Sequence, residues 1–460
     1  MRIGKSIYEM IRHICRAIVH RYRDYTNYGN FPMLWRKHTE VPFGTIGVRE
    51  WIGLNSAAMW YVKNHRMRIK NCSGVMQKLK ECMQTQYSVE DKKIIFIIEL
   101  VATARLEKIT KALCKRGYRI TLLYNTKMVP KTEGLERLKE YCEAVHGYNR
   151  VAQLLYYTIE SRIPIVHFYV AYNNFASILL LLQVKGIMPR IIAEKYDIFN
   201  GTTPYKEAKK RYCRAEKYFM EHSDGVCCRE FSMEYCVKEL GFELRREYLV
   251  FLDYAEEQIF EEKEKQEELS LCYVGEICTE KEYPGASYAC FLELAAKCER
   301  NNCHLHVYPF MWSETRFSQY IKYAQNSQYF HFHHPVEHNK LYEEISQYDY
   351  GIHPVKSTYL DREIDGCITR NKLIYASTNK YFDYISAGIP IIGISPVIIT
   401  KEIEKTGGII RWSIDDYDFD ELKRRKKELR DELLQNRGYW MIDNRISELT
   451  DYYEEVLQDA

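Results

Sequence analysis

The sequence predicts an α/β protein with two doubly wound parallel sheets, one after the other along the chain. Two series of apolar strands alternate with helical segments, and a run dominated by Glu, Lys and Gln separates them at residues 253–268. Strands that alternate with helices at this spacing form parallel sheets, because each helix returns the chain to the edge where the next strand begins. A chain of 460 residues is long enough to bury two such cores.

The first series opens with residues 92–100, which read KKIIFIIEL, a continuous apolar run typical of a strand buried on both faces. A helical pattern over 105–116 follows and leads to a second strand at 118–125. No glycine-rich turn joins the first strand to its helix, which argues against a dinucleotide site. Further strands are expected at 162–169, 189–194 and 225–228, the last closing this sheet.

The second series follows an expected exposed, helical connector. It begins with LSLCYVG at 269–275 and continues through the strand-like segments HLHVYPF, QYFHFHH, YDYGIHP, PIIGI and GIIRW, with helices between them. From residue 421 the chain becomes highly charged and predicts a pair of helices. The expected divisions are an extension at 1–90, a first domain at 91–252, a linker at 253–269, a second domain at 270–420 and terminal helices at 421–460.

The predicted extension is basic. Residues 1–90 contain fifteen Lys or Arg against six Asp or Glu. Apolar residues from Ile7 to Val19 recur at helical spacing, with Arg12 and Arg16 largely off that stripe. A basic amphipathic helix of this kind, within residues 1–24, can lie on an anionic membrane surface or dock on its own protein with the basic face in solvent. The sequence leaves both interpretations open.

Composition excludes several classes of protein. A disordered chain does not contain 46% hydrophobic and 14% aromatic residues, and a net charge of +3 gives no case for a nucleic-acid partner. The fifteen cysteines are scattered without a CxxC pair, as expected for reduced thiols of a cytosolic protein. We expect no secretory signal and no membrane span, and therefore a cytoplasmic location, with the inner face of the cell membrane as a peripheral alternative.

The stretch 379–393, NKYFDYISAGIPIIG, predicts a short helix that runs into a parallel strand. Gly388 can adopt the positive φ that ends a helix, and Pro390 cannot continue one. The free N–H groups and positive dipole end at the start of this helix suit a phosphate. Lys380 lies in its first turn and Asp383 one turn further on. An ordinary helix-to-strand corner is the alternative.

This stretch resembles the donor-site signature of GT-B glycosyltransferases, especially glycosyltransferase family 4, in its lysine, aromatic pair, acid and Ala-Gly-x-Pro corner. The resemblance implies two facing Rossmann-like domains and terminal helices that return to the first domain. It implies that Asp383 holds the donor ribose and that a strand-ending glycine, Gly275, lies at the diphosphate. It also gives Lys281 a charge-neutralising role. The backbone of Ser386, Ala387 and Gly388 would approach the diphosphate.

The chain departs from this family pattern at two positions. Glu276 follows Gly275 where an arginine is common, and a carboxylate beside a diphosphate is repulsive unless it turns away or is protonated. Tyr375 occupies the position of a first glutamate, eight residues before Asp383. Lys380 would then take over part of the charge role.

Other polar residues follow predicted strands, where a parallel sheet binds its ligands. His167 lies near the end of one strand and Asp197 just past another, and each is a candidate catalytic residue, with a structural histidine and a turn-capping aspartate as the alternatives. His334 is a candidate contact for the nucleotide base, as the resemblance implies. The histidines of the run 330–338 suggest a metal site, but packing explains them equally well, so no metal is assigned.

The expected activity is transfer of a sugar from a nucleotide-sugar donor to a surface glycan, a lipid-linked saccharide or a protein. No cofactor and no bound metal are expected, because lysines and helix N-termini can stabilise the leaving group. The resemblance implies a retaining reaction; an inverting one needs a base, for which Asp197 and His167 are the candidates. A catalytically inactive GT-B subunit that acts as a scaffold, and a nucleotide-sugar epimerase, are the alternatives.

Overall fold

The computed structural model describes ten main segments of the chain and several short pieces between them. The predicted extension at 1–90, and with it the basic helix within residues 1–24, lies outside the described residues. The main described segments are 92–98, 103–127, 132–148, 163–170, 190–195, 210–257, 267–277, 291–357, 374–395 and 397–458.

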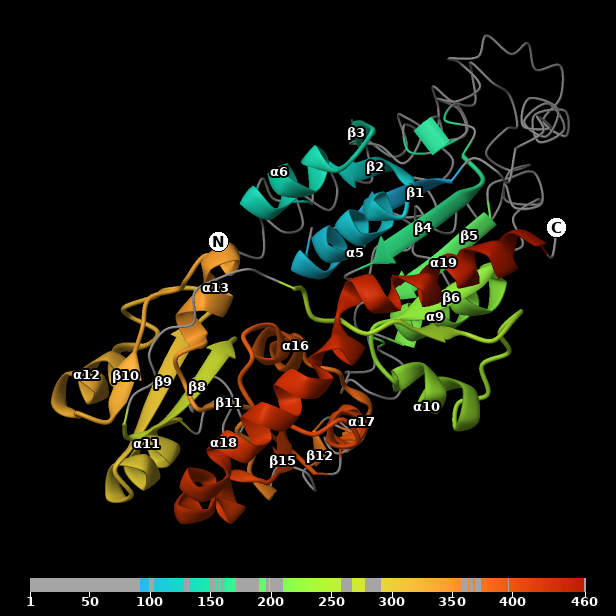
Figure 1. Cartoon of the computed structure of the whole chain (residues 1–460). Coiled ribbons are helices and arrows are strands. Elements are labelled where there is room, and N and C mark those ends of the chain that lie inside the picture. The colour runs from blue at the N-terminus through green and yellow to red at the C-terminus, as the bar shows by residue number, and fades with distance from the viewer. Residues whose placement is uncertain are drawn as a thin grey trace, which may run out of the picture.

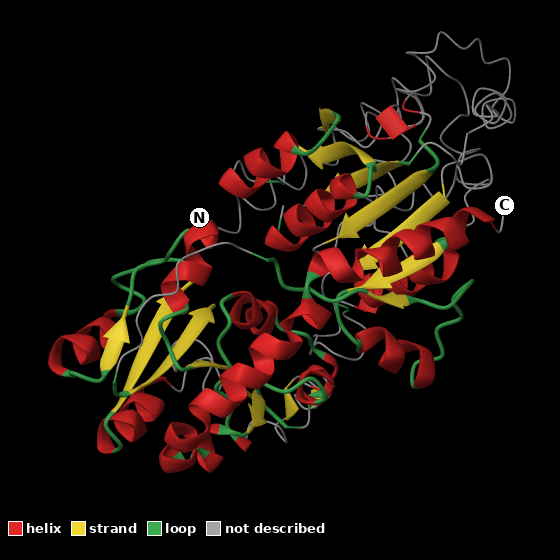
Figure 2. Cartoon of the chain, viewed as in Figure 1, coloured by secondary structure: helices red, strands yellow, loops and turns green. Residues whose placement is uncertain are grey.

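The described chain forms two lobes, each built on one parallel sheet with helices packed against it (Figures 1 and 2). The first sheet has seven strands in the order β3-β2-β1-β4-β5-β6-β7. Every neighbouring pair in it is parallel. Its strands are β1 Lys93–Ile98, β2 Arg119–Asn125, β3 Ala144–Tyr148, β4 Ile165–Val170, β5 Arg190–Lys195, β6 Gly225–Cys228 and β7 Leu249–Val250, and its helices are α5 Ala104–Lys115, α6 Glu133–Glu140, α9 Lys210–His222 and α10 Ser232–Lys238.

The second sheet repeats this plan with six strands in the order β10-β9-β8-β11-β14-β15, again all parallel. A small antiparallel pair, β12 Glu363–Ile364 and β13 Cys367–Ile368, stands apart. The strands are β8 Leu269–Gly275, β9 Cys303–Pro309, β10 Phe330–Phe332, β11 Tyr350–Ile352, β14 Ile391–Gly393 and β15 Ile409–Arg411. The helices of this lobe are α11 Phe291–Arg300, α12 Ser318–Asn326, α13 His338–Ile345, α16 Asn379–Ser386, α17 Ile398–Glu404 and α18 Phe419–Asn436, with short 3-10 helices at Ile414–Asp416 and Arg437–Trp440. The last helix of the described chain is α19 Ile442–Gln458.

Both sheets have the strand order of a doubly wound fold, in which the third, second and first strands are followed by the fourth and later ones. The predicted fold class is therefore confirmed, and two such lobes in one chain are the GT-B arrangement. The order reverses between β1 and β4 in the first lobe and between β8 and β11 in the second. Ligands of such sheets bind beyond the carboxyl ends of the strands at these switch points, so a ligand site of the second lobe is expected beside β8 and β11.

One expectation about the first sheet and one about the connector that follows it are wrong. β6 does not close it, because the two-residue strand β7 pairs beyond it. The start of the expected exposed connector is neither helical nor exposed: Asp253, Tyr254 and Ala255 are buried, and Ala255 forms a bridge with Met441. The chain between the lobes is therefore part of the core where it leaves β7.

The last helix, α19, packs on the first lobe beside α5, although the strands of the second lobe precede it in the chain (Figure 1). Its apolar face buries Ile446, Leu449 and Val456. The hydroxyl of Tyr452 accepts a hydrogen bond from the Val226 backbone N–H at 2.8 Å. In the part of the chain that is described, no helix has both the length and the apolar character needed to cross a bilayer.

A buried group of charged residues lies between α5, β4 and β5. The Arg105 guanidinium contacts Glu194 with its Nε at 2.9 Å and donates to the carbonyls of Leu252 and Phe251 at 2.5 and 2.6 Å. Burial opposes the charge on Glu194, but Arg105 and His167 outweigh it and lower the pKa of this carboxyl to about 2. The pair therefore stabilises the fold at neutral pH, where both groups are charged.

We expect Glu194→Gln to lower the free energy of unfolding at neutral pH by about 3–5 kcal/mol, because it leaves the Arg105 charge buried without its partner. The difference from the wild type should shrink as the pH falls from 4.5 towards 2, where Glu194 itself becomes protonated. Urea unfolding at several pH values measures this. The control is Glu143→Gln, whose pair with Arg119 is about half exposed and should cost less than about 1 kcal/mol; equal costs would contradict the prediction.

Candidate functional site

Helix α16 lies directly on the strands at the switch point of the second sheet. Tyr384 of this helix covers Gly351 of β11, where an added Cβ would lie 2.2 Å from the tyrosine Cγ. The Tyr384 hydroxyl donates to the Ile352 carbonyl at 2.9 Å and lies 3.3 Å from the Val274 N–H of β8. The absence of a side chain at Gly351 thus allows the helix to dock at hydrogen-bonding distance from both strands.

The start of α16 meets the end of β8 at Lys380 and Gly275. Gly275 has a φ of 131°, which favours glycine, and a Cβ at this position would lie 3.9 Å from Lys380 Nζ. Lys380 Nζ donates to Thr378 Oγ1 at 3.0 Å and lies 5.2 Å from the ring centre of Tyr273. Thr378 is the N-cap, and its side chain makes no capping hydrogen bond. An ammonium group, a helix N-terminus and a strand end without a side chain therefore converge.

Charged groups surround Lys380. Burial, together with the charge of Arg229, lowers the pKa of Lys380 to about 8. The carboxylates of Asp383 and Glu276 oppose this shift. The lysine is half-buried at the positive end of a helix, where a cation is disfavoured and an anion is favoured. A bound anion at this position would favour the charged lysine.

The first lobe reaches this end of α16 through Arg229, which directly follows β6. Its Nη1 donates to Asn379 Oδ1 at 2.8 Å and to the Ser377 carbonyl at 3.0 Å, both at the start of the helix. The same atom lies 3.0 Å from Asp253 Oδ2. The sequence analysis missed Arg229, although its position just past a strand end is the signal that selected Asp197.

Asp383 faces α13. Its Oδ1 accepts a hydrogen bond from the buried Tyr342 hydroxyl at 3.3 Å and lies 3.7 Å from His338 Nε2. The structure thus brings three of the predicted donor-site residues to one end of α16: Gly275, Lys380 and Asp383.

Ser386, Ala387 and Gly388 lie at the other end of α16, about 10 Å along its axis. The Ser386 hydroxyl donates to the Phe382 carbonyl at 2.8 Å and accepts from the Glu256 N–H. All three residues are buried. The three residues therefore lie away from Lys380, and the approach of their backbone to a diphosphate stays a prediction.

The two departures from the family pattern have different surroundings. Glu276 is exposed, and its carbonyl accepts a hydrogen bond from the Tyr273 hydroxyl at 2.6 Å. Tyr375 contacts the first lobe: its carbonyl accepts from the Phe231 N–H at 3.0 Å, and its ring centre lies 5.6 Å from that of Tyr235 in α10. The residue that replaces the expected glutamate thus forms part of the contact between the lobes.

His167 has an exposed fraction of 0%. Its Nε2 lies 2.8 Å from Glu194 Oε2 and its Nδ1 lies 2.7 Å from the Tyr453 hydroxyl, so both nitrogens are occupied within the core. This environment favours the structural alternative over a catalytic role. Asp197 and Lys281 lie outside the described residues, and their roles stay predictions.

His334 lies just past the end of β10 and is exposed. Its ring stacks on Trp312, with ring centres 3.9 Å apart. The neighbouring Phe310 and Met311, which follow β9, are 78% and 53% exposed. A stacked aromatic pair beside exposed apolar residues suits a planar base, although no contact joins this pair to Lys380.

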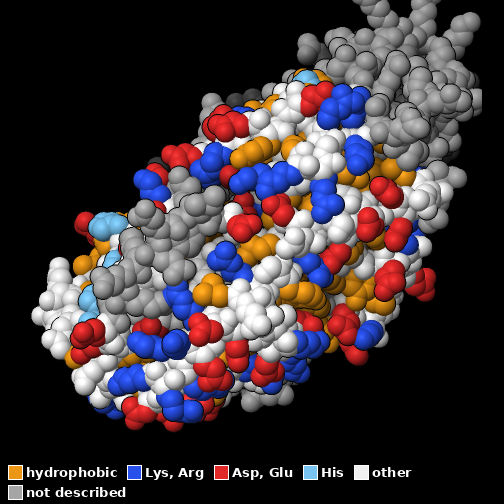
Figure 3. All heavy atoms as spheres, viewed as in Figure 1, with side chains coloured by type: hydrophobic (Ala, Val, Ile, Leu, Met, Phe, Trp, Pro, Cys, Tyr) orange, Lys and Arg blue, Asp and Glu red, His pale blue; other side chains and the backbone are white. Residues whose placement is uncertain are grey.

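Four histidines lie together on one side of β9, β10 and the residue that follows β10. The sequence analysis identified only those of the run 330–338 and not the two on β9. We call His304, His306, His331 and His333 the histidine face; histidine side chains reach the surface along the left edge of the second lobe in Figure 3. His304 Nδ1 lies 2.9 Å from His331 Nε2, and His306 Nδ1 lies 3.0 Å from His333 Nε2. Burial and repulsion among the rings lower the pKa of His306 to about 2 and that of His333 to about 4.

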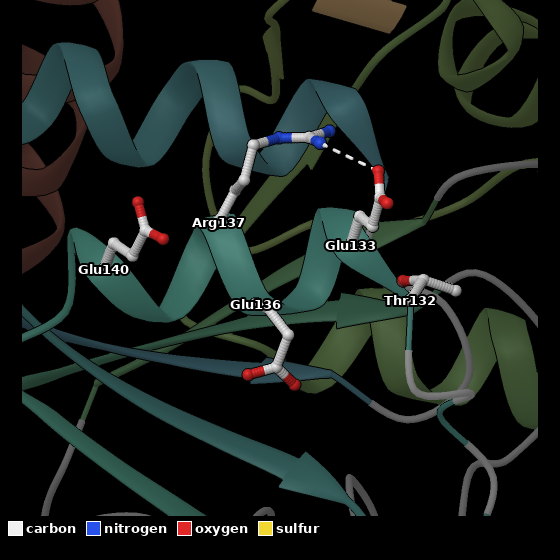
Figure 4. Close-up of a pocket in the computed structure, with 5 residues that line it drawn as sticks. All are labelled: Thr132, Glu133, Glu136, Arg137 and Glu140. Atoms are coloured by element: carbon white, nitrogen blue, oxygen red, sulfur yellow. Dashed lines mark ion pairs between the residues drawn. The ribbon is translucent and has the colours of Figure 1, made fainter. Parts of the chain in front are cut away.

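One hollow of about 430 Å³ lies on α6, away from these groups (Figure 4). Arg137 and Glu133 point towards one another across it, with 3.9 Å between Nη1 and Oε2. Glu136 and Glu140 complete its charged lining. None of the predicted site residues lines this hollow. We interpret it as a groove between charged side chains on the solvent side of α6.

No protein-family model and no curated protein sequence matches the chain. Several solved structures are similar in fold. A Thermobaculum terrenum O-GlcNAc transferase mutant has a TM-score of 0.48 and 12% identity, covering 88% of this chain and 78% of that one. A putative UDP-N-acetylglucosamine 2-epimerase from Listeria monocytogenes has a TM-score of 0.49 and 9% identity, and the match covers 79% of this chain and 97% of that one. A UDP-glucosyltransferase from Polygonum tinctorium has a TM-score of 0.47 and 10% identity, and the match covers 80% of this chain and 100% of that one. Likeness at this level gives no information on activity or substrate.

We expect Gly351→Ala to destabilise the protein by about 1–3 kcal/mol, because the new methyl group would overlap the Tyr384 ring and displace α16. Gly438→Ala is the matched control, since its Cβ would meet nothing closer than 3.8 Å. Urea denaturation of both variants measures the difference. Equal midpoints would show that α16 does not depend on this contact.

We expect Lys380→Met to be more stable than the wild type at about pH 7 and to lose this advantage towards about pH 10. The pKa of Lys380 is about 8 in the fold against an ordinary 10.5, so the folded chain binds fewer protons between these values and its stability rises with pH across them. The exposed Lys340→Met variant should show no such trend. Thermal denaturation across this pH range tests the prediction, and a constant difference for Lys380→Met would refute it.

Proposed function

We propose that this chain is a glycosyltransferase that binds the diphosphate of a nucleotide-sugar at the start of α16. One observation carries the proposal: Lys380 Nζ, the N-terminus of α16 and the side-chain-free end of β8 converge at the switch point of a doubly wound sheet. Backbone can approach a phosphate closely at Gly275, and the helix and the lysine supply positive charge to it.

The charges at this position suit a leaving nucleoside diphosphate. Arg229 and Lys380 bring two cations to one helix N-terminus, and Asp253 pairs with the first of them. A departing diphosphate gains negative charge as the sugar bond breaks, and fixed cations stabilise that charge without reorganisation. We therefore propose a metal-independent transfer in which Arg229 and Lys380 hold the leaving group.

The remaining roles follow from the family 4 resemblance. Asp383 holds the ribose, and the base lies towards His334 and Trp312. The reaction is retaining, so the departing phosphate accepts the proton of the acceptor and no side-chain base is needed. A glycan, a lipid-linked saccharide or a protein is the acceptor, and the basic residues 1–24 hold the enzyme at an anionic membrane surface.

A second function is favoured by the contact between the lobes. Arg229 already bonds the start of α16, and Tyr375 bonds Phe231 where the family pattern has a carboxylate. A GT-B subunit without catalytic activity would keep such a contact closed and would bind nucleotides weakly. A nucleotide-sugar epimerase is the third possibility, and it would convert the donor without any acceptor.

Thermal denaturation with UDP, GDP, CMP and their sugars tests the donor site. A ligand that binds only the folded protein stabilises it by about 2.7 kcal/mol at about 100 times its dissociation constant, so one nucleotide class should raise the melting temperature by several degrees. Asp383→Ala and Lys380→Met should each reduce that shift by at least half. Lys340→Met, which changes an exposed lysine on α13, should keep the full shift in melting temperature.

The outcomes separate the three candidates. A shift that needs Lys380 and Asp383, followed by release of the nucleoside diphosphate with an acceptor extract, supports the transferase. Conversion of the donor alone indicates the epimerase. The absence of any shift and of any turnover indicates the inactive subunit and overturns the proposal.

A further inference from the structure

The histidine face offers imidazole nitrogens at metal-binding separation. His304, His306 and His331 each present one nitrogen, and these three nitrogens lie within 4.8 Å of one another. The two strands hold them by register, because His331 pairs directly with His306 and His304 lies two residues earlier on the same face of β9. Three convergent imidazoles on adjacent strands form a ligand set for a divalent transition ion.

A carboxylate fixes the orientation of one of these rings. Glu268, just before β8, lies 2.8 Å from His304 Nε2. An N–H at Nε2 that donates to this carboxylate leaves a lone pair on Nδ1, the atom that faces His331 Nε2 at 2.9 Å. Metal-bound histidines in proteins are commonly oriented by a carboxylate in this way.

Packing alone does not satisfy the polar atoms of this cluster. Among the described residues, His306 Nε2 is buried and has no hydrogen-bond partner. Buried polar atoms without a partner are rare in native proteins. His167, which we assign to packing, has a partner at both nitrogens at 2.7 and 2.8 Å. His306 therefore has a buried nitrogen that no described residue satisfies, as expected of a metal ligand, whereas both nitrogens of His167 are satisfied, as expected of a structural ring.

A second cluster, His167, Glu194 and Cys227, also has its ligand atoms within 4.8 Å, but it does not suit a metal. All three residues are fully buried, and the Arg105 guanidinium already contacts the Glu194 carboxylate at 2.8 Å. A cation at that place would meet a charge of the same sign. Among the described residues, no Lys or Arg forms a hydrogen bond or ion pair with the histidine face, which reaches the surface at His304 and His331.

We propose that His304, His306 and His331 bind one divalent transition ion of the class that prefers imidazole, with Zn²⁺ as the representative, and that Glu268 positions His304. In tetrahedral geometry, bonds of about 2.05 Å place ligand nitrogens about 3.3 Å apart, so His304 and His331 separate slightly when the ion replaces their shared proton. The ion ties the edge strand β10 to β9. This site does not depend on the proposed donor site at α16.

Zn²⁺ titration of the full-length protein without an affinity tag tests the proposal, after removal of metals with a chelator. Competition with a chromophoric chelator should show one tight equivalent, and Zn²⁺ should raise the melting temperature. The double variant His304→Gln/His331→Gln should bind at least tenfold more weakly. Glu268→Gln, an exposed change that leaves all three ligands in place, should weaken binding by about tenfold.

The matched control is His334→Gln, because His334 lies three residues from His331 but stacks on Trp312 outside the cluster. It should keep the tight equivalent. Co²⁺ distinguishes the ligands: imidazole coordination gives visible d–d bands without the intense near-ultraviolet band of a thiolate. Circular dichroism confirms that each variant is folded. Binding by the double variant equal to that of the wild type, a thiolate band, or no tight equivalent in the wild type would each overturn the proposal.

Discussion

The Arg105 guanidinium is the charge on which the arrangement of the two lobes depends. It binds Glu194, two carbonyls of the segment that leaves the first lobe, and, at 3.6 Å, Asp253. Asp253 in turn binds Arg229, which holds the start of α16. Since Arg105, Glu194 and Asp253 are almost fully buried, loss of one leaves its neighbours unpaired, and the series acts as a unit. In order, it runs through Tyr453, His167, Glu194, Arg105, Asp253, Arg229 and Asn379.

This series places two opposing demands on Arg229. The same guanidinium that a leaving diphosphate would need already satisfies Asn379 and the Ser377 carbonyl. A ligand at α16 must therefore share Arg229 or displace it, and displacement would loosen the contact between the lobes. If the proposed ligand binds there, the contact between the lobes and ligand binding would be coupled through the Arg229 side chain, and the sign of that coupling would separate a transferase from a scaffold.

The sequence predicts what local patterns encode and misses what depends on register. All seven residues of β8 are predicted, because a continuous apolar run is unambiguous, and α16 is found through its capping residues and Gly388. β3 is only half-buried and β7 has two residues, so neither shows a clear pattern. The histidine face joins residues 27 positions apart, and only the pairing of β9 with β10 reveals it. The burial of His167 depends on Tyr453, 286 residues away.

The position of α19 has a consequence for synthesis of the chain. The first lobe begins to emerge from the ribosome with β1, but its core includes Ile446, Leu449 and Tyr453, which are translated after the whole second lobe. During that interval α5 lacks its contact with α19, and His167 Nδ1 lacks the Tyr453 hydroxyl. The nascent first lobe is thus an unfinished domain that must avoid aggregation until α19 has been synthesised.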